Sequence, residues 1–217
     1  MIVTIDGPAG AGKSTIARGL ARRLGFRFLD TGAMYRAVAL AALVRGHDWK
    51  MPEKLVELAR QIHIEVGENR VTLDGRDVTT QIRTNEVTDL THYAANNPGV
   101  RAILVELQRR SAGNDDLVTE GRDQGTIVFP HAACKIYLTA SPEERARRRA
   151  QELTARGQLT SVEEVLRDQS RRDTSDATRT VGPMIAADDA VEVATDGLDP
   201  QQVLDRLEAL VREKMTP

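Results

Sequence analysis

The chain has 217 residues, a formal net charge of −2 and 41% hydrophobic residues. This length favours one domain with a moderate insertion over two full domains, and the hydrophobic content excludes a disordered chain. The near-neutral charge argues against broad attraction to nucleic acids or anionic membranes. Only 3% of the residues are aromatic, which argues against a base-stacking surface for single strands.

The basic residues are five lysines and 25 arginines. Arginine matches phosphate groups bidentately, although a codon preference for arginine would explain the excess equally well. Cys134 is the single cysteine and lies in an apolar run, so we expect a buried, inert thiol and a reducing compartment. No basic leader precedes the first expected strand, and the longest apolar run, 37–44, is too short for a bilayer. We therefore expect a cytoplasmic protein.

The N-terminal residues predict a strand, a phosphate-binding loop and a helix with apolar residues at helical spacing. The loop fits the pattern G-x-x-x-x-G-K-[ST], in which backbone N–H groups point at phosphate oxygens. Lys13 adds a positive charge, and the Ser14 hydroxyl is placed to reach Mg²⁺. A flexible glycine turn is the weaker interpretation. The expected ATP-binding residues are Gly7, Pro8, Ala9, Gly10, Ala11, Gly12, Lys13, Ser14 and Thr15.

The next segments continue an alternation of strands and helices. A short strand is expected at 26–29, a turn at 30–32, a helix at 33–44 and another helix at 52–61. Such an alternation predicts a parallel sheet with helices on both faces.

The middle of the chain changes to a short alternating pattern, which predicts a small antiparallel meander. Its strands are expected at 62–66, 71–73 and 78–79, with turns at 67–69 and 74–75. Two helices are expected after the meander, at about 86–95 and 99–112.

The parallel pattern then resumes, so the sequence predicts an α/β fold: a parallel sheet flanked by helices, with an inserted antiparallel meander and a helical lid. Further strands are expected at 116–120, 133–139 and 190–194, and helices at about 142–155, 161–172 and 199–214. The expected division is a core of about 1–45, 114–142 and 180–217, an insertion of about 46–113 and a lid of about 143–179.

Ligands of open parallel sheets lie at the carboxyl ends of the strands, and two such ends besides the loop carry suitable groups. Arg36 could bind a second phosphate or be a solvated helix charge, and Asp123 could face a ligand or cap a turn. Glu120 and Asp6 are further candidates for an acid near Mg²⁺, ranked below Ser14.

Arginines also gather in the expected lid, where Arg145, Arg148 and Arg149 share one helix face. They could clamp a phosphate, or Glu143, Glu144 and Glu152 could compensate them. The charged run 171–179 is similarly either a phosphate contact or a solvated face. Phosphoryl transfer needs such cations, because negative charge spreads over the transferred group in the transition state.

Taken together, these motifs resemble those of bacterial cytidylate (CMP) kinases over nearly the whole chain. The matching segments are 4–15, 29–36, 77–84, 98–101, 121–130, 141–149, 172–179 and 186–190. The resemblance implies a nucleoside monophosphate kinase fold, in which the meander enlarges the monophosphate-binding part. It also implies phosphoryl transfer from MgATP to CMP or dCMP by a monomer that binds neither nucleic acid nor membrane.

The resemblance further implies roles for individual residues. Arg36, Arg122 and Arg179 would grip the acceptor phosphate. Thr31, Arg101 and Asp123 would read the cytosine, and Arg172 and Asp176 would lie near the ribose. Tyr35 belongs to the same turn as Arg36. The expected catalytic set is Lys13, Arg122, Arg145, Arg149 and Arg179. The chemistry supports Asp123, since a carboxylate accepts a hydrogen bond from the cytosine amino group that uracil lacks.

The chain departs from the family at one expected base contact. The family often has a serine nine residues before Arg101, where this chain has His92 beside Thr91. Either side chain could replace the serine, or the contact is lost. Two other functions compete: a kinase for UMP, AMP or a non-nucleotide acid, and a nucleotide-dependent switch. The chain lacks an Asn-Lys-x-Asp motif, which disfavours a GTPase switch.

Overall fold

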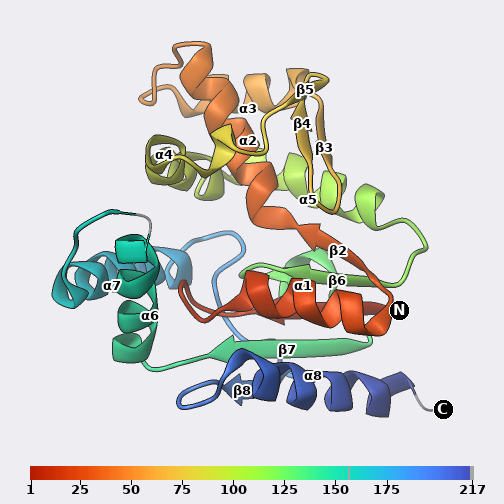
Figure 1. Cartoon of the computed structure of the whole chain (residues 1–217). Coiled ribbons are helices and arrows are strands. Elements are labelled where there is room, and N and C mark those ends of the chain that lie inside the picture. The colour runs from red at the N-terminus through yellow and green to blue at the C-terminus, as the bar shows by residue number, and fades with distance from the viewer. Residues whose placement is uncertain (156, 216–217) are drawn as a thin grey trace. The chain divides into compact units, whose positions relative to one another are not determined.

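The computed structural model describes residues 1–155 and 157–215. The chain forms two compact units, one made of residues 1–28 with the segment from 116 onward, and one made of residues 29–115. Figure 1 shows their helices and strands in chain order. No helix within 1–155 and 157–215 has the length and apolar character needed to cross a membrane.

The first unit is built on a five-stranded sheet with the order β2-β6-β1-β7-β8. The strands are β1 (Ile2–Asp6), β2 (Arg27–Asp30), β6 (Leu117–Glu120), β7 (Cys134–Thr139) and β8 (Val191–Ala194). The β1–β6, β1–β7 and β7–β8 pairs are parallel, as the strand–helix alternation predicts. Strand β1 is central, so the loop that follows it starts between the ends of β6 and β7.

Helices α1 (Lys13–Leu24) and α8 (Pro200–Met215) pack side by side along this sheet (Figure 1). Their buried side chains join those of all five strands in one apolar core. The members at its centre are Val3, Ile5, Leu20, Ile136, Leu138, Val193 and Leu207. Burial of this core fixes the direction of α1 and therefore the position of the loop before it.

Helices α6 (Pro142–Ala155) and α7 (Val162–Ala177) form the expected lid region and share a small core of their own. Ser161 begins α7 with a capping box, in which Ser161 and Glu164 each accept a backbone N–H from the other. Helix α7 continues five residues beyond the end predicted at 172. The charged residues of this extension have partners in the fold, which the sequence pattern does not reveal.

The second unit contains the inserted meander and four helices. The helices are α2 (Thr31–Val44), α3 (Pro52–Gln61), α4 (Asn85–Ala95) and α5 (Pro98–Ala112), with a 3₁₀ turn, η1 (Gln81–Arg83), before α4. The strands β3 (Ile64–Val66), β4 (Val71–Leu73) and β5 (Arg76–Asp77) form an antiparallel sheet in that order. The predicted three-stranded antiparallel meander is therefore confirmed, although the bounds of its last strand differ.

The third strand of the meander lies two residues earlier than predicted. Asp74 and Gly75 both have positive φ angles, of 50° and 78°, so they form a tight turn and pairing resumes at once. The Val78 N–H still donates to the Val71 carbonyl oxygen over 2.9 Å, and the Val78 side chain is buried. Thr79 accepts the Val71 N–H through its hydroxyl, which closes the end of the meander.

Candidate active site

The phosphate-binding loop turns sharply between β1 and α1. Gly7, Gly10 and Gly12 have φ angles of 142°, 80° and 85°, a region that disfavours side chains. A Cβ at Gly7 would lie 2.0 Å from the Leu138 carbonyl oxygen, so only glycine fits there. The loop ends at the N-terminus of α1, where free N–H groups and the helix dipole attract anions.

Lys13, the first residue of α1, is a buried cation, with 5% of its surface exposed. Its Nζ donates a hydrogen bond to the Pro8 carbonyl oxygen over 2.7 Å. Burial, followed by repulsion from Arg122, lowers the pKa of Lys13 to about 7, although Glu120 acts in the opposite direction. A polyphosphate in the loop would supply the negative charge that this ammonium group needs.

Ser14 and Glu120 bring two oxygen ligands together at the end of β6. The Ser14 hydroxyl donates a hydrogen bond to Glu120 Oε1 over 2.7 Å. Mg²⁺ prefers oxygen ligands and is commonly held by one or two protein groups with substrate phosphates. Among residues 1–155 and 157–215 no cluster of three or more His, Cys, Asp or Glu side chains could hold a metal ion. The Ser14–Glu120 pair nevertheless fits a Mg²⁺ ion shared with phosphates.

Asp6 fixes the segment that follows the Gly121-Arg122-Asp123 turn. Its Oδ1 accepts the Gln124 N–H over 2.9 Å, and its Oδ2 accepts the Gly125 N–H over 2.7 Å. These bonds begin η2 (Gln124–Val128), a π-helical turn that the sequence did not predict. Burial raises the pKa of Asp6 to about 6, although both N–H groups act to lower it.

Arg122, Asp176 and Arg179 form a charged network between that turn and the end of α7. Arg122 Nε lies 2.8 Å from Asp176 Oδ2, and Arg179 lies 3.3 Å from Asp176 Oδ1. Burial would raise the pKa of Asp176, but the two arginines outweigh it and lower the pKa. Asp123, next to Arg122, is buried. Arg172 lies close enough to lower the pKa values of Lys13 and Asp176.

Arg145 and Asp173 hold the peptide group of Ala9 in the loop. Arg145 donates to the Ala9 carbonyl oxygen over 2.8 Å, and Asp173 Oδ1 accepts the Ala9 N–H over 3.1 Å. The two side chains also form an ion pair at 2.5 Å. Arg145 therefore connects α6, α7 and the loop in this structure.

The other two arginines on the Arg145 face of α6, Arg148 and Arg149, have acidic partners. Arg148 pairs with Glu144 at 2.7 Å and also donates to the Thr195 carbonyl oxygen. Arg149 pairs with Glu152 at 2.7 Å. In this structure, acidic side chains of the same helix therefore neutralise these two arginines. A role for them in phosphoryl transfer stays a prediction.

Four of the predicted acceptor residues belong to the second unit. Thr31 begins α2 and is buried, after Asp30, whose carboxylate accepts the Ala33 N–H and pairs with Arg83 at 3.0 Å. The Arg101 guanidinium lies over the Tyr35 ring, 5.6 Å from its centre. Arg101 also donates to the Ala95 carbonyl oxygen over 3.1 Å.

Arg36 on α2 is the fourth residue of that set, and His92, the position of the uncertain base contact, lies on α4. Arg36 lies 3.5 Å from the Thr88 hydroxyl. The exposed His92 ring has its Nδ1 2.6 Å from the Asp89 carbonyl oxygen, which makes Nδ1 the protonated nitrogen. The remaining acceptor residues, Asp123, Arg172, Asp176 and Arg179, belong to the first unit.

A comparison with protein families decides the identity of the chain. The family model described as cytidylate kinase matches residues 3–213. The chain belongs to the cytidylate kinase family. A cytidylate kinase of Rhodopirellula baltica is 53% identical over 98% of this chain and 93% of that protein. A cytidylate kinase of Desulfitobacterium hafniense is 48% identical over 98% and 93%.

The fold agrees with this membership. A shikimate kinase structure from Bacteroides thetaiotaomicron superimposes with a TM-score of 0.52, covering 98% of each chain at 14% identity. That likeness concerns the fold alone. The α/β class with a parallel sheet and a small antiparallel insertion, predicted from the sequence, is confirmed.

Sequence reasoning missed some contacts in this cytidylate kinase family site. Asp173 was treated only as part of a charged run, and its bond to the loop depends on how α7 returns to the sheet. Asp6 and Glu120 were considered as metal-binding acids. The structure gives Asp6 two bonds to η2 and places Glu120 beside Ser14, where the metal-binding role of Glu120 stays a prediction. Their positions at strand ends were the only signal in the sequence.

Proposed function

We propose that this protein transfers the γ-phosphoryl group of ATP to CMP or dCMP and releases CDP or dCDP. The observation that carries the proposal is the placement of two cations, the buried Lys13 and the partly buried Arg122, close enough for Arg122 to lower the pKa of Lys13. Like charges in a buried site are tolerated when an anion lies with them. The phosphates of the two substrates supply such anions.

The donor contacts follow from the loop. The N–H groups of residues 10–15 bind the β-phosphate, and Lys13 neutralises the γ-phosphate. Ser14, with Glu120 behind it, would hold the Mg²⁺ ion that neutralises phosphate charge when bound. The short Ser14–Glu120 distance of 2.7 Å supports this assignment.

The acceptor contacts extend the proposal to both units. We infer that Arg36, Arg122 and Arg179 bind the CMP phosphate, while Asp176 keeps the last two arginines oriented. Thr31, Arg101 and Asp123 read the cytosine. Tyr35 supports the Arg101 guanidinium, and Arg172 and Asp176 lie near the ribose. A carboxylate at Asp123 selects the cytosine amino group over the uracil oxygen, which would repel it.

The protein lowers the barrier mainly by positioning and by neutralising charge. Arg122 and Arg179, which bind the CMP phosphate, are proposed also to contact the γ-phosphoryl group during its transfer. Arg145 and Arg149 of α6 are proposed to complete the neutralisation of its charge. Closure of the lid helices over the triphosphate would keep water from competing with CMP. The family resemblance also supports a monomeric, cytoplasmic enzyme, which sedimentation and cell fractionation test.

An acceptor panel tests the proposal. The purified protein with MgATP is assayed for ADP release with CMP, dCMP, UMP, AMP or no acceptor. We expect release that depends on CMP or dCMP, much slower release with UMP, and background without acceptor. Faster transfer to UMP or AMP would favour a different kinase. Equal release without acceptor would indicate a hydrolytic switch.

A further inference from the structure

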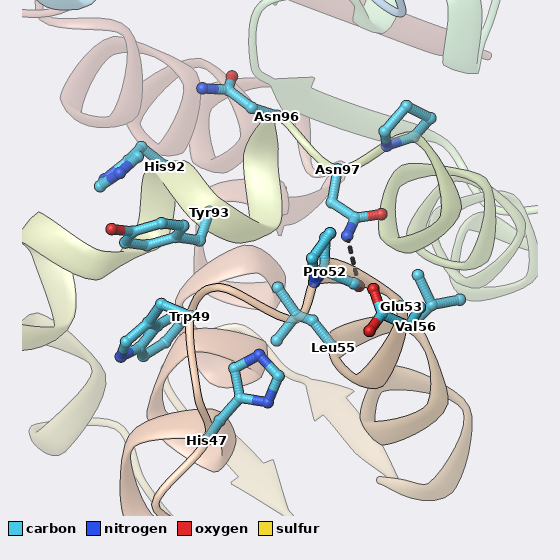
Figure 2. Close-up of a pocket in the computed structure, with 11 residues that line it drawn as sticks. His47, Trp49, Pro52, Glu53, Leu55, Val56, His92, Tyr93, Asn96 and Asn97 are labelled. Atoms are coloured by element: carbon cyan, nitrogen blue, oxygen red, sulfur yellow. Dashed lines mark hydrogen bonds between the residues drawn. The ribbon is translucent and has the colours of Figure 1, made fainter.

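A pocket of about 450 Å³ lies within the second unit, at the α2–α3 connection, the start of α3 and the end of α4 (Figure 2). Its volume is in the range of small-ligand sites. None of Thr31, Tyr35, Arg36 and Arg101 lines it; of the residues considered for the acceptor, only His92 does. The lining residues are His47, Trp49, Pro52, Glu53, Leu55, Val56, His92, Tyr93, Asn96, Asn97 and Pro98.

Aromatic rings gather in this pocket although they are rare in the chain. The single tryptophan, Trp49, stacks on Tyr93 with ring centres 4.8 Å apart and planes 29° apart. His47 meets Trp49 edge-on at 5.3 Å, and His92 lies 4.1 Å from Tyr93. Figure 2 shows the Trp49 and Tyr93 rings together on one side of the view, with Glu53 on the other. Trp and Tyr faces are the preferred partners of cations.

The charged groups that line the pocket disfavour anionic ligands and favour cations. Neither arginine nor lysine occurs among these lining residues, although the chain has 30 such residues. A phosphate or carboxylate ligand would therefore find no cation there. Glu53 supplies a carboxylate, and the C-terminal end of α4, at His92 to Asn96, adds the negative end of a helix dipole.

A buried acceptor completes the set. The Nε2 atom of His47 is inaccessible and has no hydrogen-bond partner among the described residues. In the tautomer protonated on Nδ1, this nitrogen could accept a hydrogen bond from a ligand N–H group only after the imidazole ring turned toward the pocket. Buried polar atoms without a partner are rare, and a ligand is one of the explanations for them.

We propose that this pocket binds the guanidinium group of an arginine-like organic cation. The planar cation would stack on the Trp49–Tyr93 pair and pair with the Glu53 carboxylate. A guanidinium has an apolar face, which suits the aromatic rings, and N–H donors in its plane, which suit the carboxylate. The cation is either a small free molecule or an arginine side chain of a partner protein.

Trp49 provides the test, because the fluorescence of the single tryptophan reports on the pocket directly. The full chain is titrated with Nα-acetylarginine amide and with Nα-acetylcitrulline amide, a neutral compound of nearly the same shape. We expect a saturable change with the arginine compound, with a Kd on the order of a millimolar, and binding at least about tenfold weaker for citrulline. Equal binding of the two, or no saturable change, would overturn the proposal.

A matched pair of variants locates the site. Glu53→Gln is expected to weaken arginine amide binding about fivefold, as the loss of a partly exposed ion pair does. Glu57→Gln, one turn further along α3 and outside the lining, serves as control and should leave binding unchanged. Tyr93→Phe should retain binding and Tyr93→Leu lose it. Equal affinities for the two Glu variants would contradict the assignment.

The same titration shows whether the pocket is distinct from the CMP site. It also shows whether the cation is a small molecule or a side chain of a partner protein. Saturating CMP is expected to leave the arginine amide Kd within about twofold; competition would assign the response to the acceptor site and refute a separate pocket. A short arginine-containing peptide that binds at least about tenfold more tightly than the amide points to a partner protein. Equal affinities of peptide and amide point to a small cation.

Discussion

Lys13 shows how strongly a single residue of the loop depends on its ligand. Without phosphate nearby, burial and Arg122 both oppose its charge, so that its pKa is lowered to about 7. The lysine is therefore held for binding and contributes little to the stability of the empty fold. A residue whose charge is disfavoured in the empty fold is expected to serve ligand binding, whereas a residue whose charge is favoured there maintains the structure.

We expect Lys13→Ala to lower kcat by about 10³-fold or more, as the loss of a charge on the transferred group does. Thermal unfolding should be unchanged or shifted slightly upward, since a disfavoured charge is removed. Steady-state rates and circular dichroism melts measure both effects. A variant with near-normal rates would refute the assignment of Lys13 to the ATP site. An unfolded variant would show that Lys13 also maintains the fold.

Asp123 is expected to decide between cytosine and uracil. Asp123→Ala should lower kcat/KM for CMP by about 10²-fold or more, because the amino group of the base loses its acceptor. The Kd of ATP, measured by calorimetry without CMP, should change less than about twofold. Equal losses for CMP and ATP would show that Asp123 maintains the turn and does not read the base.

Asp6 gives the stability of the fold a predictable pH dependence. Its pKa is about 6 in the fold against 3.8 for a free group, so the folded state binds the proton more tightly. The protonated form stabilises the fold fully below about pH 4, and this contribution is lost as the pH rises through 6. Relative to Asp6→Asn, the wild type should lose about 2 kcal/mol of unfolding free energy between pH 4 and 7. Denaturant titrations measure this difference, and a constant offset between the two proteins would contradict it.

At the scale of elements, α6 and α7 are joined to the loop through Arg145 and Asp173. Both side chains contact the peptide of Ala9, between the glycines that make the turn. The position of α7 is therefore coupled to the conformation of the loop. That coupling lets an element remote in sequence influence ATP binding.

Asp173→Ala should raise the KM for ATP by about tenfold and speed amide exchange in α7, since the loop loses an acceptor and Arg145 loses its partner. Asp168→Ala is the matched control, because Asp168 lies on the same helix and pairs only at the surface with Arg171. Similar exchange and similar KM values in the two variants would show that the Asp173 contact does not hold the loop.

The elements also show what the sequence can predict. Helix starts with local signals, such as Ser141 before Pro142 and Pro98 in α5, agree with the structure within a residue. The end of α7 and the π-helical turn η2 do not have such signals. The first depends on Asp176 pairing with Arg122, and the second on Asp6 binding two N–H groups from another strand end. Contacts between distant segments decide both.

The candidate site follows the same rule. The loop from Gly7 to Ser14 was predictable, because a continuous pattern specifies its backbone and its charge. Glu120 was predictable only as one of two acids, since its approach to Ser14 requires the parallel pairing of β1 and β6. Asp173 was not predictable as a loop ligand. The pocket around Trp49 was not predicted either, because its residues come from two segments that are distant in the sequence, 47–56 and 92–98.

At the scale of the whole molecule, the chain divides the proposed acceptor residues between its two units and keeps the donor loop in one. The parallel sheet provides Lys13, Ser14, Arg122 and Asp123 at its strand ends, and the inserted unit provides Thr31, Arg36 and Arg101. The central claim is that the protein phosphorylates CMP.

A competition experiment tests that claim most directly. The protein is incubated with Mg²⁺, γ-labelled ATP and equal concentrations of CMP and UMP, and the labelled products are separated. We predict that the label appears in CDP, with at least about tenfold less in UDP and a background amount in free phosphate. Label mainly in UDP or in free phosphate would contradict the account.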